Sequence, residues 1–133
     1  MTAPPTPPTR RALVVDDEEV IRRAIRRFLQ RQGWAVDEAE DGDVALALLL
    51  GDAEPAYEVI FCDLRMPGMS GEQFFDALAA SRPALAARVV VTTGDAFTTE
   101  AARFIARSGC AVLNKPFDLA ELRAVVEQVA GQA

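Results

Sequence analysis

Apolar residues along the chain form two kinds of segment, which alternate. Short, nearly continuous apolar runs are typical of strands that are buried on both faces of a sheet. Longer segments carry apolar residues at every third or fourth position, which is the spacing of one face of a helix. The short runs predict strands at residues 12–15, 34–38, 56–62, 88–92 and 111–114. The longer segments predict helices at residues 18–31 and 44–50, from Ser70 or Gly71 onward, at residues 98–108, and after Asp118.

Start and stop signals flank these predicted helices. Asp41 and Asp118 are placed to accept hydrogen bonds from the free N–H groups of a first turn. Gly33 and Gly109 follow helix ends, where glycine readily closes a helix. The last helix is expected to bury one apolar face, made of Leu119, Leu122, Val126 and Val129.

The helix at residues 44–50 is unusually apolar, because its second half is almost entirely alanine and leucine. Burial in the core is the expected reason. Exposure of Leu46 or Leu50 would instead indicate a contact surface.

Alternation of strand and helix predicts an α/β fold, in which helices cover both faces of a five-stranded, doubly wound parallel sheet. Ligands of such open sheets bind beyond the carboxyl ends of the strands. Functional residues are therefore expected where the strands end.

Polar side chains follow four of the predicted strands. The first ends in Asp16-Asp17, the third in Asp63, the fourth in Thr92-Thr93, and the fifth in Asn114-Lys115. A lone acid after a strand is often only a helix cap, and Asp16 taken alone could be one. Three carboxylates on one sheet edge, however, repel one another and need a cation. Lys115 neutralises one charge, and a hard divalent ion such as Mg²⁺ suits the carboxylate oxygens.

The loop DLRMPGMSG begins at Asp63 and is strongly specified. Pro67 stiffens it, and Gly68 and Gly71 are expected to supply backbone angles that other residues adopt only with strain. A carboxylate at the end of a central strand that faces a metal and a lysine can act as a nucleophile toward phosphorus and form an acyl phosphate. Asp63 is that candidate by position.

Composition narrows the class of protein. The 133 residues suit one domain, the net charge of −6 disfavours direct binding of nucleic acid, and the absence of histidine removes the commonest general base and zinc ligand. Cys62 and Cys110 lie in apolar runs and are expected to be buried thiols in a reducing compartment. No apolar run reaches membrane-spanning length, so a cytoplasmic location is expected. Residues 1–10 are rich in proline and are expected to be a disordered tail.

These features together resemble the receiver domain of two-component response regulators. The resemblance rests on Asp16-Asp17, Asp63 in its loop, Thr93-Gly94 and Lys115-Pro116-Phe117, and it covers residues 11–131. It implies a receiver domain at 11–133 with a flavodoxin-like sheet of strand order 2-1-3-4-5. It also implies a signalling phosphoacceptor, not an enzyme in the usual sense.

The resemblance assigns roles to individual residues. Asp63 would accept a phosphoryl group from a phosphohistidine on a histidine kinase or a histidine phosphotransfer protein. Asp17, Asp63 and the main-chain carbonyl of Arg65 would bind Mg²⁺ directly, and Asp16 would bind it through water. Lys115 would pair first with Asp63 and then with a phosphoryl oxygen.

Thr93 would move its hydroxyl onto the phosphoryl group. It is preferred over Thr92 because it directly precedes the small Gly94, as the switch hydroxyl of the family does. The resemblance further implies a cis peptide bond before Pro116.

The sequence departs from the family at one position that bears on switching. Val112 stands where many receivers have an aromatic switch residue. Because valine is short and stiff, phosphorylation is expected to cause only a modest conformational change on the face formed by the last two helices and the fifth strand. Phe97 is a candidate to take the place of the missing aromatic ring. Arg65 and Asp95 occupy the two loop positions that tune dephosphorylation in the family, and their opposite charges could pair.

The arginines of the first helix could form a docking face, as this helix contacts the kinase in the family. They could equally be a solvated face in which Glu18 and Glu19 offset Arg22 and Arg23 at i,i+4 spacing.

Other functions stay open at this point. A haloacid-dehalogenase-like phosphatase also uses a Mg²⁺-bound nucleophilic aspartate, but it has a second acid two residues later, where this chain has Arg65, and its nucleophile lies on the first strand. A phosphate-independent, receiver-like scaffold is a further alternative. No output domain is expected within these residues, and the motif TTGD…LNKPFD is similar to receivers attached to hybrid histidine kinases. The chain is therefore expected to be either a stand-alone receiver or part of a larger regulator. A monomer or a weak homodimer is expected. The kinase and the downstream protein partner are not indicated.

Overall fold

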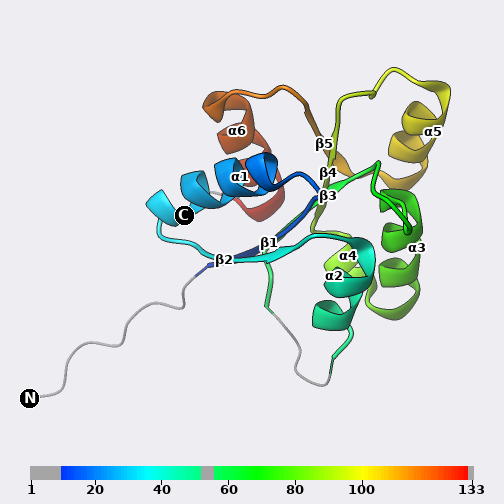
Figure 1. Ribbon diagram of the computed structural model, residues 1–133, viewed down its shortest axis with the longest axis horizontal. Coiled ribbons are helices and arrows are strands. Elements are labelled where there is room, and N and C mark those ends of the chain that lie inside the picture. Colours follow the sequence, from blue (N-terminus) through cyan, green and yellow to red (C-terminus); the bar gives the residue numbers. More distant parts are fainter. Residues whose placement is uncertain (1–9, 52–55, 132–133) are drawn as a thin grey trace, which may run out of the picture.

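The computed structural model describes residues 10–51 and 56–131, in which strands and helices alternate as the apolar pattern predicts (Figure 1). The strands are β1 (Arg11–Val15), β2 (Ala35–Ala39), β3 (Val59–Asp63), β4 (Val89–Thr93) and β5 (Ala111–Asn114). The helices are α1 (Glu19–Arg31), α2 (Gly42–Leu49), α3 (Gly71–Ser81), α4 (Pro83–Ala86), α5 (Thr99–Ser108) and α6 (Leu119–Ala130). Residues 1–9 of the expected disordered tail lie outside the described residues. For Arg10 the expectation is wrong, because its side chain is held by Glu58, Trp34 and the carbonyl of Ala130.

All strand pairs are parallel, and the sheet has the order β2-β1-β3-β4-β5. This confirms the predicted doubly wound architecture. The order places β3 at the centre with β1 and β4 on either side, so the carboxyl ends of these three strands meet at one edge.

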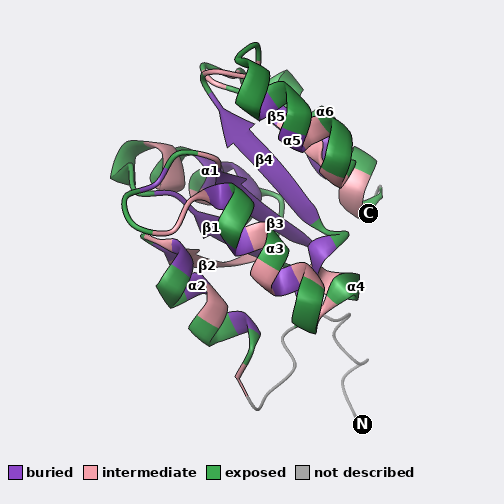
Figure 2. Cartoon of the chain, turned by 90° about the vertical axis from the view of Figure 1, so that its right-hand side faces the viewer, coloured by how far each residue is buried: buried purple, intermediate pink, exposed green. Residues whose placement is uncertain are grey.

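Helices cover both faces of the sheet (Figure 1). On one face, α1 and α6 pack through Ile25, Leu29 and Leu122 against sheet residues such as Val14 and Phe61. On the other, α2, α3, α4 and α5 pack against the alternate sheet residues, with their buried side chains Ala45, Leu49, Phe74, Leu78, Ala86 and Phe104. Figure 2 shows β3 and β4 buried along their length, while the outer faces of the helices are exposed. Burial of both faces explains why the strands are continuous apolar runs.

Some element boundaries differ from the prediction. Strand β3 begins at Val59, because its pairing with β1 starts at Ala12, and it ends on Asp63 itself. Strand β2 is displaced by one residue, to Ala35–Ala39. The short helix α4 was not predicted, and it starts with Pro83, which suits the first helical position because its missing N–H has no partner to lose there.

The predicted core face of α6 is correct for Leu122 and Val126 but wrong for Leu119, which is 61% exposed. Leu119 is the first residue of α6 and lies at the carboxyl edge of the sheet, where no strand remains to cover it. In α2, Ala45 and Leu49 are buried and Leu46 is partly buried, whereas Leu50 is exposed. The apolar character of α2 therefore serves the core only in part.

Arg10 closes the amino edge of the sheet. Its guanidinium stacks over the Trp34 ring, pairs with Glu58 (Nε to Oε2, 2.9 Å) and donates to the backbone carbonyl of Ala130. Both ends of the described domain are therefore joined at the edge opposite Asp63. None of the helices among the described residues is both long and apolar enough to span a bilayer.

Candidate functional site

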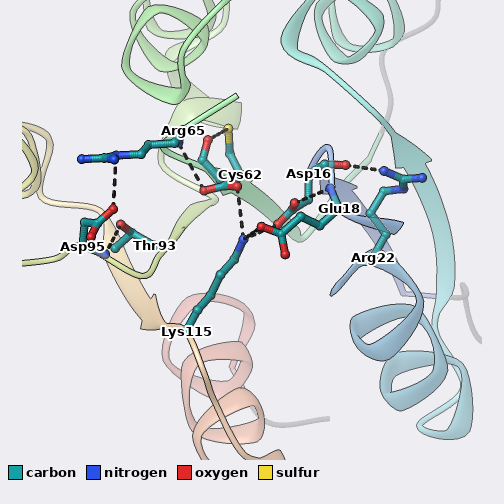
Figure 3. Close-up of polar contacts among 9 residues, drawn as sticks. Asp16, Glu18, Arg22, Cys62, Arg65, Thr93, Asp95 and Lys115 are labelled. Atoms are coloured by element: carbon teal, nitrogen blue, oxygen red, sulfur yellow. Dashed lines mark hydrogen bonds and ion pairs between the residues drawn. The ribbon is translucent and has the colours of Figure 1, made fainter. Parts of the chain in front are cut away.

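Asp63 is the last residue of β3. It belongs to a polar site in which Lys115 extends toward Asp16 and Glu18 (Figure 3). Its side chain is almost fully buried. One carboxylate oxygen, Oδ2, accepts a hydrogen bond from Lys115 Nζ (3.1 Å), and the other, Oδ1, accepts one from the backbone N–H of Arg65 (3.2 Å). The carboxylate is thus held at a fixed angle by two donors from different loops.

Asp16 directly follows β1, and its side chain is buried beside Asp63. Its Oδ1 accepts a hydrogen bond from the backbone N–H of Glu18 (2.8 Å), and its Oδ2 lies 2.9 Å from Lys115 Nζ. Arg22 donates to the backbone carbonyl of Asp16, which ties α1 to this loop. Lys115 therefore joins the ends of β1 and β3 by binding one carboxylate from each.

Four carboxylates come together here: oxygens of Asp16, Asp17, Glu18 and Asp63 all lie within 4.8 Å of one another. The sequence predicted three of them. Glu18 was missed as a site residue because it was interpreted only as part of the helix face, although its position directly after Asp16-Asp17 was the available signal. Its Oε1 lies 3.9 Å from Lys115 Nζ.

The donor set fits a hard divalent cation. Every clustered ligand atom is a carboxylate oxygen, and Lys115 supplies a single positive charge against four acids. Oxygen donors of this kind are those that Mg²⁺ and Ca²⁺ prefer. The role of the Arg65 carbonyl as a ligand stays a prediction.

The crowding of these charged groups changes the pKa values of Asp63 and Lys115. Burial raises the pKa of the Asp63 carboxyl above its usual value, and the charge of Asp16 raises it further, while Lys115 and the Arg65 N–H oppose this rise. Burial alone would lower the pKa of Lys115. The hydrogen bond and charge of Asp16, together with the charge of Asp63, more than offset that effect and raise it. These two acids therefore favour the charged form of Lys115.

Thr93 is the last residue of β4 and is buried one position beyond Thr92, which pairs in register with Asp63. Its Oγ1 accepts a hydrogen bond from the backbone N–H of Asp95 (3.0 Å), so the hydroxyl is held on the side of the β4–α5 loop. The carboxylate of Asp95 in turn pairs with Arg65, with 3.2 Å between Oδ2 of Asp95 and Nε of Arg65. This is the pair that the opposite charges of the two residues suggested.

The loop after Asp63 is specified partly as predicted. Gly68 has a φ of +76°, which favours glycine. For Gly71 the expected reason is wrong: it lacks a positive φ, but a Cβ there would lie 2.4 Å from the backbone oxygen of Asp63. Close packing of α3 against the end of β3 therefore requires Gly71. Ser70 and Gln73 form a capping box that starts α3 at this point.

Three smaller expectations can be compared with the structure. The peptide bond between Lys115 and Pro116 is cis, as the resemblance implied. Cys62 and Cys110 are both free thiols, as expected. Cys62 is buried, but Cys110 is only partly buried.

Three arginines of α1 pair with acids, though not all as predicted: Arg22, Arg23 and Arg26. Arg23 pairs with Glu19 (Nη2 to Oε1, 2.8 Å), as expected for i,i+4 spacing. Arg22 pairs with Glu38 of β2 in place of Glu18 (Nε to Oε1, 3.5 Å), since Glu18 is turned toward Lys115.

Comparison with known proteins identifies the family. The profile of the family described as "Response regulator receiver domain" matches residues 12–127. The chain belongs to the response regulator receiver domain family. It is a receiver domain of the kind used in two-component signalling.

Relatives and solved structures agree with this assignment. The chain is 52% identical to the transcriptional regulatory protein ResD of Bacillus subtilis over 59 residues, 44% of this chain and 23% of ResD. It is 40% identical to hybrid signal transduction histidine kinase E of Dictyostelium discoideum over 70 residues, 53% of this chain and 4% of the kinase. The structure of the chemotaxis protein CheY4 of Vibrio cholerae superposes with a TM-score of 0.80 at 28% identity, covering 92% of this chain and 99% of CheY4. The matches thus span less than a quarter of these two longer relatives.

Proposed function

We propose that this receiver domain accepts a phosphoryl group on Asp63 from a phosphohistidine of a histidine kinase or histidine phosphotransfer protein. The observation that carries the proposal is the placement of Asp63: a buried strand-end carboxylate that binds Lys115 and lies within 4.8 Å of other acids. The similarity to a part of hybrid kinase E supports a donor of this type.

Transfer requires an ionised and well-oriented nucleophile. The Arg65 N–H and Lys115 Nζ orient the two oxygens of Asp63, and the ammonium favours the carboxylate form. As an oxygen–phosphorus bond forms at Asp63, the nitrogen–phosphorus bond of the donor breaks, and the histidine nitrogen leaves with the electron pair. Lys115 then remains beside the new acyl phosphate and pairs with one of its oxygens.

Asp16, Asp17 and Asp63 would hold Mg²⁺, with the Arg65 carbonyl as a further direct ligand and Asp16 acting through water. When bound, Mg²⁺ would offset negative charge on the phosphoryl oxygens. The acidic residues of this chain themselves attract the cation and set its position relative to Asp63.

Thr93 would leave the Asp95 N–H and donate its hydroxyl to a phosphoryl oxygen. Its burial at the end of β4, the strand next to β3, supports this role. Partner binding would change as a consequence of this movement.

Incubation with acetyl phosphate and Mg²⁺, followed by intact mass measurement, tests the proposal. One added phosphoryl group is expected for the native chain and none for Asp63→Asn. The same measurement separates the alternative of a phosphate-independent scaffold, for which no adduct forms on the native chain. A haloacid-dehalogenase-like phosphatase is not supported, because Asp63 lies on β3 and Arg65 occupies the general-acid position.

A further inference from the structure

Thr92 carries a buried hydroxyl group beside Asp63. Its side chain is 1% exposed, and its Oγ1 has no hydrogen-bond partner among the described residues. Burying a hydroxyl without a partner destabilises a fold, because the hydrogen bonds that it made to water are lost and not replaced. Valine has the same shape and would avoid this cost. The hydroxyl of Thr92 therefore adds no stability to the structure as described.

Strand register places this hydroxyl next to the phosphoacceptor. Thr92 of β4 and Asp63 of β3 are paired in register, and neighbouring strands lie about 4.8 Å apart. Thr92 follows Val90 by two positions and Asp63 follows Phe61 by two, and both apolar residues belong to the core beneath α1 and α6. Side chains two positions apart on a strand point to the same face of a sheet. The side chains of Thr92 and Asp63 therefore stand side by side on the face that α1 and α6 cover.

Lys115 crosses over Thr92 to reach Asp63. Its backbone N–H donates to the carbonyl of Thr93 (2.8 Å), which continues the pairing of β5 with β4. Its Nζ nevertheless lies 3.1 Å from Asp63 Oδ2 on β3 (Figure 3). Because β4 lies between β5 and β3, the side chain of Lys115 passes above Thr92. This arrangement explains why the hydroxyl is shielded from solvent.

Phosphorylation would change the hydrogen bonds of the Asp63 carboxyl group. In the structure, Oδ2 accepts from Lys115 and Oδ1 accepts from the Arg65 N–H. In the acyl phosphate one of these oxygens carries the phosphorus and the other is a carbonyl oxygen, while the ammonium moves to the phosphoryl group. A carbonyl oxygen has two lone pairs, so it can bind Mg²⁺ and still accept a hydrogen bond. Thr92 can supply that bond by a rotamer change, and it would give up no hydrogen bond formed within the described chain.

We propose that Thr92 is a second functional hydroxyl of the site, which donates a hydrogen bond to the carbonyl oxygen of the Asp63 acyl phosphate once Lys115 has moved to the phosphoryl group. The inference rests on the proposed function, because this carbonyl oxygen exists only when Asp63 is phosphorylated. No proton is transferred, since the hydroxyl keeps its hydrogen. The bond stabilises the phosphorylated form relative to the resting form. Thr92 thereby acts on Asp63 itself, whereas Thr93 would act on the phosphoryl group.

Two substitutions separate the hydroxyl of Thr92 from its shape. Thr92→Val keeps the shape and removes the hydroxyl, whereas Thr92→Ser keeps the hydroxyl and removes a buried methyl group. In urea denaturation without a phosphoryl mimic, Thr92→Val is expected to be at least as stable as the native chain. Thr92→Ser is expected to be less stable, because it leaves a small cavity.

The binding of beryllofluoride, a reversible mimic of the phosphoryl group, should rank the variants in the opposite order. At saturating Mg²⁺, calorimetry is expected to show about fivefold weaker binding to Thr92→Val, which is the effect of one hydrogen bond. Thr92→Ser should bind beryllofluoride like the native chain, because it retains the donor. A merely structural role of Thr92 would give the order of the stabilities.

The carbonyl band of the acyl phosphate gives a direct signature of the hydrogen bond. A hydrogen bond weakens a C=O bond, so the infrared band should lie at higher wavenumber in phosphorylated Thr92→Val than in the native chain or Thr92→Ser. Aspartate labelled with a heavy isotope at the side-chain carboxyl carbon distinguishes this band from that of acetyl phosphate.

Intact mass of the native chain after treatment with acetyl phosphate separates the two ideas. Absence of an adduct overturns the proposed function and the role of Thr92 together. If an adduct forms, three results overturn the role of Thr92 alone. These are equal beryllofluoride affinity of Thr92→Val and the native chain, an unshifted carbonyl band, and a loss of stability in Thr92→Val, which would show that the hydroxyl is already bonded in the resting form.

Discussion

Arg65 and Asp95 join the two loops that border the site, with 3.2 Å between Nε of Arg65 and Oδ2 of Asp95. Arg65 follows Asp63 by two residues, and Asp95 follows Thr93 by two. The pair therefore links the loop after β3 to the loop after β4 (Figure 3), and we expect it to hinder the approach of water to a phosphoryl group on Asp63. Both side chains are exposed, so the pair is a weak closure that ordinary fluctuations open.

Removing this pair should shorten the lifetime of the phosphorylated form. Arg65→Ala and Asp95→Ala are each expected to speed loss of the adduct by at most about fivefold, since an exposed ion pair is worth at most about 1 kcal/mol. The decay of the adduct after removal of acetyl phosphate measures this. The double variant should decay no faster than the quicker single one; fully additive effects would show that the two residues act independently.

Asp17 should contribute directly to cation binding. Asp17→Asn is expected to weaken the affinity for Mg²⁺ by at least about tenfold, because even partners that only support a metal ligand are typically worth 10- to 100-fold. Glu18→Gln, which changes the neighbouring member of the carboxylate cluster, should have a smaller effect and serves as the matched control. Calorimetric titration of both variants checks this, and equal affinity in Asp17→Asn and the native protein would refute the ligand role.

Asp63 should make stability depend on pH in the absence of metal. Its folded-state pKa is raised, mainly by burial and then by Asp16, so the folded state holds a proton more tightly than the unfolded chain. Stability is therefore lost as pH rises from the ordinary aspartate pKa of 3.8 through the raised value. Asp63→Asn has no such proton, so in EDTA its melting temperature should exceed that of the native protein at neutral pH, and the gain should vanish in acid. A gain that is independent of pH would contradict this assignment.

Gly71 should tolerate no side chain. A Cβ would lie 2.4 Å from the Asp63 backbone oxygen, which cannot move without shifting the end of β3. Gly71→Ala is expected to lower the free energy of unfolding by about 1–3 kcal/mol, as overpacking usually does, and to reduce the yield of adduct. Gly94→Ala is the control, because its Cβ would lie 4.0 Å from the backbone oxygen of Lys115, which is ordinary van der Waals contact. Urea denaturation should show this variant near native stability.

The periodicity of apolar residues was sufficient to predict the parallel sheet, and the family resemblance predicted its strand order. The polar residues at the strand ends predicted that Asp16, Asp63 and Lys115 come together. These features depend on the buried apolar runs, which can be found in the sequence, and on the parallel direction of the strands, which follows from the alternation of strand and helix. Polar residues at the ends of parallel strands must meet once the sheet forms.

Side-chain partners that depend on helix rotation were harder to predict. Glu18 turns toward Lys115 and leaves Arg22 to Glu38, a choice that the i,i+4 rule does not foresee because it considers only the helix itself. Leu119 is exposed since α6 begins beyond the sheet, and Gly71 is required by a long-range approach to Asp63. Such contacts arise from how elements are placed against one another.

Locating the phosphoryl group tests the central claim most directly. The chain would be treated with acetyl phosphate and Mg²⁺, the acyl phosphate reduced with borohydride, and the peptides identified by mass. Reduction of an aspartyl phosphate gives homoserine. We predict homoserine at position 63 alone, with none formed in Asp63→Asn. Homoserine at position 16 or 17, or an equal yield in the Asp63→Asn variant, would contradict the account.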